Sequence, residues 1–534
     1  MKITKVFCQR KFRTVIAILC LSFISYITHI WYDYYAYQRY VRWVHKKEYA
    51  AEKYYASPER TSPTPADQYF VEHIPYFSKH LQGYIRKIED VRSRMLSIAH
   101  RGKPSVAPAY TLVDGYDENF FAILEGNPQV ETVFLAINEN EVDQILPVKK
   151  YFDYGSNALG CERGVKLEWA VYHNGFELYN KTCRTNLRET LVPRSIDRKS
   201  LSVGLPFQLS AIDKAPTGHP PSNLILTFVN IVSNAFLSSN GDVFVNDTCI
   251  KTQRCNKEIR YPKNNSKIPY YEEVLTITEQ GTIWYYHMTV EDLPRIAPYI
   301  LFLRNNPQIK IHVSLSGYHL EMLAELGFGT DRIIWGDVSA KIVYLPAGTT
   351  CGRPSVFTTS LMSYLLRQAV EKRIGKQKQD SIVILERADS YRQFKHHDEI
   401  HQAVQKLANE HNLRVQIFSD RLLPSLRVGM EIFYRAKAVI GPHGSGMANM
   451  IFTQPRTVVI EGLCYMENWY YFCLKAGFIP WLCVKPASRF SFTFRNIAAT
   501  LGLHYYGIVR KDDCLYTTPE EVVTPLRYYL EHLQ

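Results

Sequence analysis

A glycine-rich turn with one histidine is the stretch of this chain best suited to chemistry. Residues 441–449 read Gly-Pro-His-Gly-Ser-Gly-Met-Ala-Asn and follow a short apolar run that ends at Ile440. This pattern predicts a strand, a tight loop and a helix, in which the glycines let a ligand approach the backbone closely. Amide groups at the start of such a helix attract anions, and His443 adds a side-chain donor. We predict an anion site here; the alternative is an ordinary turn in which His443 is only hydrogen-bonded.

A second group of candidate residues lies in the stretch 281–295. His287, Glu291 and Arg295 recur every four residues, which places them on one face of a helix that begins near His287. A histidine and a carboxylate beside a cleft could remove the proton of an acceptor hydroxyl as general base. Asp292 would point about 100° away from Glu291 and is the weaker candidate. The alternative is a solvated helix face with one i,i+4 pair, and the sequence does not choose between Glu291 and His287 as the base.

Three further polar residues follow predicted strands or lie on the helix after the turn. Arg387 comes just after the strand 381–385, where its guanidinium could form paired hydrogen bonds with a diphosphate. Glu461 ends the strand 457–461, where a carboxylate could accept hydrogen bonds from ribose hydroxyls. Asn449 is either a ligand contact or a polar residue of the helix. Each of these residues also has a purely structural alternative, such as a surface arginine, a helix cap or an ion pair.

The elements that must position these residues alternate regularly from about residue 353. Helices are predicted at 358–373, 398–410, 425–435 and 445–452, and strands at 381–385, 414–418, 438–441 and 457–461. Such βα units predict a parallel sheet with helices on both faces. The last helix, 519–533, is amphipathic and is expected to pack back across both domains.

The preceding part of the chain mixes short strands and helices. Strands are predicted at 132–136, 167–172, 224–229, 241–245, 309–313 and 342–345, and a helix at 289–305. With 534 residues, the chain is too long for a single core. We therefore predict an α/β domain at 106–345 and a second, Rossmann-type domain at 346–534, facing each other across a cleft.

The amino terminus predicts a membrane anchor. Residues 1–13 hold five basic side chains and no acid, and residues 14–32 form an uncharged run long enough to span a bilayer. The positive flank places 1–13 in the cytosol and the rest of the chain in a lumen or outside the cell, with 33–105 as a stem that includes a helix at 77–98. A cleaved signal peptide is the alternative.

Sequons and cysteines agree with a luminal location. Asn180, Asn246 and Asn264 each begin an Asn-X-Ser/Thr sequon and are the expected glycosylation sites. Several of the eleven cysteines should pair in an oxidising lumen, with two candidate groups: Cys249 with Cys255, and the set Cys464, Cys473, Cys483 and Cys514. No zinc-ligand spacing occurs, so we expect no metal site. At this location the formal charge of +12 favours an anionic small molecule over nucleic acid.

Taken together, the motifs resemble the glycosyltransferase family 61. The resemblance rests on Tyr-Tyr-His at 285–287 with Glu291, Leu-Pro-Arg at 293–295, Cys-Gly-Arg-Pro-Ser at 351–355, Arg387, and the turn at 441–452. It runs from about residue 281 to 481 and is most specific around His443. Two positions depart from the usual pattern, because Ser445 replaces a small residue or alanine and Met447 replaces leucine.

The resemblance implies a GT-B-like pair of Rossmann-type domains behind the transmembrane helix and the stem, and an inverting transfer from a UDP-sugar. In that case Arg387, His443 and the amides of Gly444, Ser445 and Gly446 hold the diphosphate, with Asn449 and Glu461 also on the donor side. Glu291 or His287 activates the acceptor hydroxyl. The family includes xylosyl-, arabinosyl- and N-acetylglucosaminyltransferases, so xylose and N-acetylglucosamine are the expected sugars. The UDP-sugar is then a co-substrate and no cofactor is required, while stimulation by a divalent metal is left open.

The expected partners are the UDP-sugar, a glycan or glycoprotein acceptor, and the membrane of the Golgi or endoplasmic reticulum through residues 14–32, in a single-pass type II arrangement. A homodimer is left open. Two other functions are also considered: a luminal sulfotransferase, for which no phosphate-loop lysine or arginine is well placed, and a non-catalytic glycan-binding protein on the same fold. The combination of His287, Glu291, Arg387 and His443 argues against the second of these.

Overall fold

The structure is a computed structural model of the full chain, and it describes residues 75–99, 104, 106–114, 124–138, 168–172, 175–179, 224–251, 268–278, 285–314, 317–348, 356–387, 393–420, 423–463, 493–509 and 516–532. These residues all belong to one compact unit, formed by Pro58–Cys464 and Phe490–Gln534. The predicted tail at 1–13, the anchor at 14–32, the sequons of Asn180 and Asn264, and the cysteine group from Cys464 to Cys514 lie outside them. Within the described part of the chain, no helix is long and apolar enough to cross a membrane.

The first sheet is mixed rather than wholly parallel. Its eight strands run in the order β1-β6-β5-β10-β7-β8-β9, with β2 paired to β5. β10, β7, β8 and β9 are parallel to one another, whereas β5 is antiparallel to β2, β6 and β10. The bounds are β1 Val106–Asp114, β2 Val130–Asn138, β5 Leu224–Leu237, β6 Val243–Lys251, β7 Tyr270–Thr276, β8 Lys310–His312, β9 Ile333–Ile334 and β10 Val338–Pro346. A separate antiparallel pair joins β3 (Glu168–Tyr172) to β4 (Gly175–Tyr179).

Helix α3 (Pro75–Ile98) packs on β2, β5 and β10 of this sheet. Its apolar residues recur every three or four positions, so one stripe of the helix is buried: Tyr84, Ile85, Ile88, Val91 and Met95. Arg92 adds a paired contact with Glu273 of β7, with Nε 2.6 Å from Oε2. This helix falls within the predicted stem at 33–105, and the contacts of residues 75–98 place it on the first sheet.

The second sheet is wholly parallel, as the βα alternation predicted. Its order is β12-β11-β13-β14-β15. The strands are β11 Ser381–Glu386, β12 Arg414–Ser419, β13 Ala436–Pro442, β14 Val458–Leu463 and β15 His504–Val509. Most side chains of β11, β13 and β14 are fully buried. This burial explains why the three strands appear in the sequence as apolar runs.

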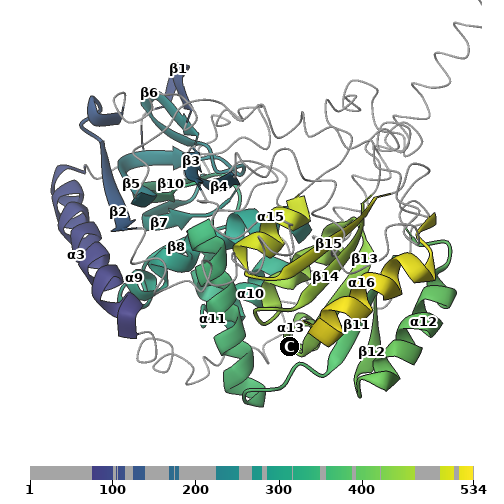
Figure 1. The fold of residues 1–534 in the computed structure, drawn as a ribbon. Coiled ribbons are helices and arrows are strands. Elements are labelled where there is room, and N and C mark those ends of the chain that lie inside the picture. Colours follow the sequence, from purple (N-terminus) through teal and green to yellow (C-terminus); the bar gives the residue numbers. More distant parts are fainter. Residues whose placement is uncertain are drawn as a thin grey trace, which may run out of the picture. The chain divides into compact units, whose positions relative to one another are not determined.

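Helices cover both faces of the second sheet (Figure 1). α12 (His397–Glu410) and α16 (Pro519–His532) pack against each other, while α11 (Val356–Ile374), α13 (Leu426–Tyr434) and α15 (Thr493–Thr500) pack around the 3₁₀ helix η8 (Ser445–Phe452). The main contacts of α16 are with α12, β14 and β15, which corrects the expectation that this helix crosses both halves of the protein.

The helix predicted at 289–305 belongs to a longer composite of four short pieces that begins at Tyr285. α8 (Tyr285–His287) continues into a π turn, η5 (Met288–Asp292), then a 3₁₀ helix, η6 (Leu293–Tyr299), and finally α9 (Ile300–Asn305). Pro294 and Pro298 lie in the 3₁₀ piece, where neither can donate a backbone hydrogen bond to a regular α-helix. The π turn widens the helix at the position of Glu291, and such turns are frequent at functional sites.

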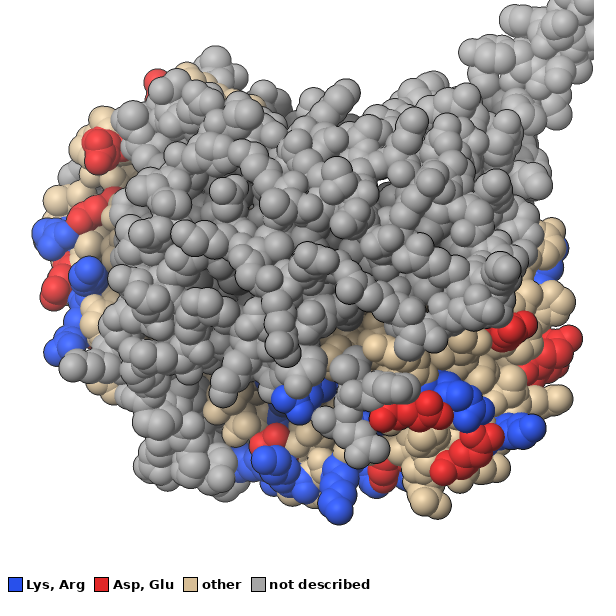
Figure 2. Space-filling view, viewed as in Figure 1, with Lys and Arg blue, Asp and Glu red and all other residues tan. Residues whose placement is uncertain are grey.

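Acidic and basic side chains are interspersed on the face shown in Figure 2. The formal excess of basic residues is therefore not gathered into one patch on the described part of that face.

Candidate functional site

The strand order of the second sheet marks one position as the natural ligand site. The chain leaves β11 for β12 on one side and then crosses to β13 on the other side of β11. In an open parallel sheet, ligands bind outside the carboxyl ends of the two strands where the order reverses. These strands are β11 and β13. Leu385, Glu386 and Arg387 stand at the carboxyl end of the first, and Pro442 and the glycine-rich turn at the end of the second.

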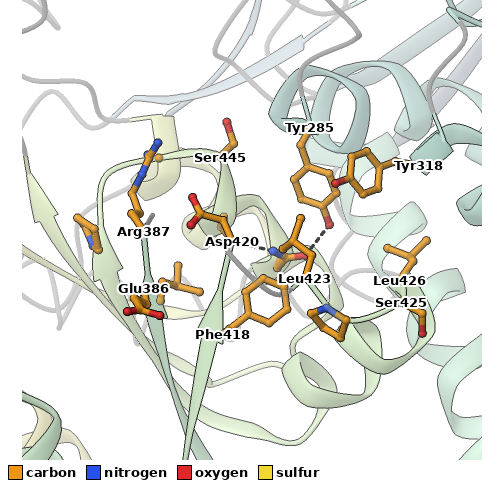
Figure 3. A pocket seen from close by; sticks show the side chains of 17 residues that line it. Tyr285, Tyr318, Glu386, Arg387, Phe418, Asp420, Leu423, Ser425, Leu426 and Ser445 are labelled. Carbon is orange, nitrogen blue, oxygen red and sulfur yellow. Dashed lines mark hydrogen bonds between the residues drawn. The ribbon is translucent and has the colours of Figure 1, made fainter. Parts of the chain in front are cut away.

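A pocket opens at this reversal point (Figure 3). Its β11 and β13 side is formed by the residues just named together with Gly444, Ser445, Gly446 and Asn449. The end of β12 and the start of α13 complete the second-sheet side with Phe418, Asp420, Leu423, Pro424, Ser425, Leu426 and Gly429. Five of the predicted donor residues therefore line one pocket: Arg387, Gly444, Ser445, Gly446 and Asn449.

Two tyrosines close the pocket from helices that connect strands of the first sheet. Tyr285 of α8 and Tyr318 of α10 (Gly317–Glu325) lie edge to face, with ring centroids 4.9 Å apart. The Tyr285 hydroxyl donates to Asn449 Oδ1 at 2.5 Å, and Asn449 Nδ2 donates to the carbonyl of Gly446 at 2.8 Å. Burial raises the pKa of Tyr285, so this hydroxyl stays protonated and acts as a donor. Asn449 thus ties the glycine-rich turn to the stretch that carries His287.

The glycine-rich turn is shaped by the arginine that lies across it. Arg387 Nη1 donates to the carbonyl of His443 at 3.3 Å, and a Cβ on Gly444 would lie only 1.9 Å from that nitrogen. Glycine at 444 therefore makes room for the guanidinium beside the amides of the turn. At Gly441 a Cβ would lie 2.7 Å from Cβ of Leu385 on the neighbouring strand, so glycine there allows the two strands to pack.

His443 is held by a buried carboxylate beside the pocket and is not among the residues that line it. Its Nδ1 lies 2.5 Å from Glu461 Oε1, and the Tyr505 hydroxyl donates to Glu461 Oε2 at 2.5 Å. The Glu461 side chain is fully buried, while that of His443 is 15% exposed. Glu461 therefore orients the imidazole. The predicted contact of Glu461 with ribose hydroxyls is not favoured by this geometry, because both of its oxygens are engaged within the protein.

His287 forms a second pair of the same kind. Its Nδ1 lies 2.6 Å from Glu291 Oε2, with the histidine side chain 26% exposed and the glutamate fully buried. Burial acts to lower the pKa of His287, but the hydrogen bond and the charge of Glu291 outweigh it, so the pKa is raised. The imidazole is therefore the more accessible member of the pair, and Glu291 positions it.

Aromatic contacts connect the two histidines. The His287 ring centroid is 5.1 Å from that of Tyr286, Tyr286 is 5.6 Å from Phe494 of α15, and Phe494 is 5.1 Å from His443. The elements also pack directly, because α8 and η5 contact η8. The structure therefore brings His287, Glu291, His443 and Glu461 to one region next to the pocket.

Arg295 does not share a face with His287 and Glu291, contrary to the prediction. It is buried, and its guanidinium donates to three backbone carbonyls: Thr278, Pro346 and Ala347. The π turn inserts one extra residue after His287, so the four-residue spacing no longer holds one face. Asp292 is also buried, with Oδ2 3.6 Å from His319 Nε2, and burial lowers the pKa of His319 to about 3.

Sequence reasoning missed Tyr285, Tyr318, Glu386, Phe418 and Asp420 as pocket residues. Asp420 lies two residues after the predicted strand 414–418, the same position that Arg387 has after the predicted strand 381–385. Tyr285 lies two positions before His287, in a string already noted. Tyr318 had no such signal, because only the tertiary packing of α10 brings it to the pocket.

Two further sequence predictions concern described residues: the glycosylation site at Asn246 and the pairing of Cys249. The Asn246 side chain is exposed and donates to Gln129 Oε1, so the position is open to the solvent. Cys249 is a buried free cysteine, and its proposed partner Cys255 lies outside the described residues. Among the described residues, no group of three or more His, Cys, Asp or Glu could hold a metal ion.

The second sheet and its pocket define an open, doubly wound α/β unit with a ligand site at its strand reversal. Residues 285–460 match the glycosyltransferase 61 family, from Tyr285 in the pocket to Ile460 of β14. No curated protein matches the chain. This match supports membership of the glycosyltransferase 61 family, confirms the resemblance inferred from the sequence motifs, and supports a glycosyltransferase activity in general.

Proposed function

We propose that the protein transfers a sugar from a UDP-sugar to a hydroxyl of a glycan or glycoprotein, with inversion at the anomeric carbon. One observation supports this most directly: the pocket at the strand reversal presents Arg387 beside the amides of Gly444, Ser445 and Gly446. A guanidinium and adjacent backbone N–H groups are the donors that a diphosphate requires. Xylose and N-acetylglucosamine are the sugars we propose, following the family.

The leaving group gains negative charge as the bond between the anomeric carbon and the diphosphate oxygen breaks. Fixed donors at that oxygen stabilise the transition state more than the ground state. Arg387 and the turn amides supply them in this proposal. His443 stands next to the same turn with Nδ1 held by Glu461, so its ring is fixed before the donor arrives.

We assign the general base to His287 rather than to Glu291. Glu291 is fully buried and already bonded to His287 Nδ1, whereas the imidazole is partly exposed. The acceptor oxygen forms its bond to the anomeric carbon as the bond to the diphosphate breaks, and its proton passes to Nε2 of His287. The raised pKa of His287 makes the imidazole a stronger proton acceptor.

We also propose that the protein is a single-pass type II protein of the Golgi or endoplasmic reticulum, with its catalytic part in the lumen. The charge pattern of residues 1–32 supports this, and so does the exposed sequon asparagine Asn246. The proposal requires no cofactor, and it leaves stimulation by a divalent metal and a homodimer open.

The test uses the full-length chain in detergent with a panel of UDP-sugars and the sulfate donor 3′-phosphoadenosine-5′-phosphosulfate. We expect at least one UDP-sugar to bind and to release UDP in the presence of a glycan acceptor. Arg387→Ala should weaken that binding, while Arg86→Ala on the exposed side of α3 should not. Binding of the sulfate donor alone would favour a sulfotransferase. Binding of a glycan without any nucleotide would favour a glycan-binding protein.

A further inference from the structure

Asp420 is the carboxylate at the carboxyl end of β12, and it lines the pocket. Its backbone N–H donates to the carbonyl of Glu386, the last residue of β11, at 3.3 Å, so the pairing of the two strands continues one residue past the end of β12. The side chain lies in the middle of the view in Figure 3, between those of Arg387 and Leu423. Asp420 is exposed, so its carboxylate can meet a ligand.

The charges of the pocket follow the strand order. β12 contributes the carboxylate of Asp420, β11 contributes Glu386 and Arg387, and β13 contributes the turn with Gly444. A diphosphate is drawn toward the arginine and the amides and is repelled by a carboxylate. The part of the ligand over β12 must therefore be uncharged, and it must offer hydrogen-bond donors to an acceptor-only side chain.

A ribose offers such donors, as a neighbouring pair of hydroxyls one linkage away from the diphosphate. The sequence predicts that Glu461 binds the ribose, but that carboxylate is fully buried between His443 and Tyr505. In doubly wound sheets the acidic residue that binds ribose follows a strand next to the phosphate-binding one. Asp420 occupies the corresponding place here, on the strand next to β11.

We propose that Asp420 accepts hydrogen bonds from the 2′ and 3′ hydroxyls of the donor nucleotide and so selects a ribonucleotide. This inference rests on the proposed function, since it assumes that a nucleoside diphosphate occupies the pocket. The apolar side chains beside Asp420 suit a flat base next to the ribose: Phe418, Leu423 and Leu426. Phe418 is held in place by the edge of Phe433, with ring centroids 4.9 Å apart.

The test compares the binding of UDP, 2′-deoxy-UDP and 3′-deoxy-UDP to the full-length protein by calorimetry. A hydrogen bond to a charged group corresponds to about a tenfold to hundredfold change in affinity. We expect the wild-type protein to prefer UDP over each deoxy analogue by about tenfold or more on this basis. Asp420→Asn should reduce the preference to near unity and leave the affinity for inorganic pyrophosphate unreduced.

The matched control is Asp398→Asn, which removes the same charge from an exposed position at the start of α12 that does not line the pocket. This variant should keep the wild-type preference. Glu386→Gln tests the neighbouring carboxylate, and loss of the preference in that variant instead would overturn the assignment to Asp420. A preference retained by Asp420→Asn, or absent from the wild-type protein, would also overturn it. If the wild-type protein binds no uridine nucleotide at all, the proposed function itself fails.

Discussion

Replacing Gly444 and Gly441 by alanine should separate ligand binding from stability. Both glycines belong to the same strand-and-turn segment, and each lacks room for a Cβ. The obstacle differs, however. At 444 the added Cβ would lie 1.9 Å from Nη1 of Arg387, the far end of a long side chain, whereas at 441 it would lie 2.7 Å from Cβ of Leu385, next to the backbone of β11.

The two obstacles give effects of different kinds. The guanidinium of Arg387 can swing aside, so Gly444→Ala should leave the fold intact but remove Arg387 from the turn. The loss of one charge-assisted hydrogen bond weakens UDP binding by about tenfold to hundredfold. The stem of Leu385 cannot move without shifting β11, so Gly441→Ala should cost about 1–3 kcal/mol of unfolding free energy, as overpacked cores do.

Urea unfolding and calorimetric titration with UDP measure the two quantities separately. Gly444→Ala should unfold at nearly the wild-type urea concentration and bind UDP weakly, with uridine, which has no phosphates, bound as in the wild type. Gly441→Ala should unfold earlier while its folded fraction binds UDP normally. The reasoning is wrong if Gly444→Ala keeps full UDP affinity, or if the loss of stability appears in Gly444→Ala and not in Gly441→Ala.

Three further predictions follow from contacts around the site and from α3. Glu291→Gln removes the charge that raises the pKa of His287, so transfer should slow and the acidic limb of its pH profile should move to lower pH, with UDP binding kept; an unmoved limb would remove His287 from the role of base. His443→Ala removes the imidazole from Oε1 of the buried Glu461, whose Oε2 keeps the Tyr505 hydroxyl, and should cost about 3–5 kcal/mol in urea unfolding while weakening UDP-sugar binding; unchanged stability and binding would show that this pair supports neither. A fragment that starts at residue 100 lacks α3 and Arg92, which pairs with Glu273, so in thermal scans it should unfold well below a fragment that starts at Pro58; equal midpoints would show that α3 does not stabilise the sheet.

The sequence predicted four of the five strands of the second sheet, β11 to β14, but not β15. Buried parallel strands read as short apolar runs between polar loops, and each predicted strand from 381 to 461 falls within a few residues of its observed bounds. The first sheet was not predictable in order. β5 pairs with β10 more than a hundred residues further along the chain, and no local pattern encodes such a partner.

The same distinction explains the outcome at the site. Arg387 and the glycine-rich turn were found because each directly follows a strand. One carboxylate oxygen of Glu461 accepts a hydrogen bond from Tyr505, which is 44 residues away in sequence. The burial of Glu461 could therefore not be predicted from the sequence of its own strand. The face assigned to Arg295 failed for a related reason, because the packing of the folded chain sets the π turn before it.

Because of that π turn, the number of residues between His287 and Leu293 determines how the two ends of this helical segment are oriented relative to each other. A π turn holds one residue more than the corresponding α-helical turn. Removing one residue from Met288–Asp292 would restore a regular helix and rotate everything before it by about 100° relative to everything after it. Tyr285 would then turn away from Asn449, and Tyr286 and His287 would lose the packing that runs through Phe494, although no residue that contacts the pocket had been replaced. In this protein the extra residue of the π turn sets the orientation of His287, the proposed base. Deleting one residue of the turn is therefore expected to abolish activity even though every catalytic side chain is kept.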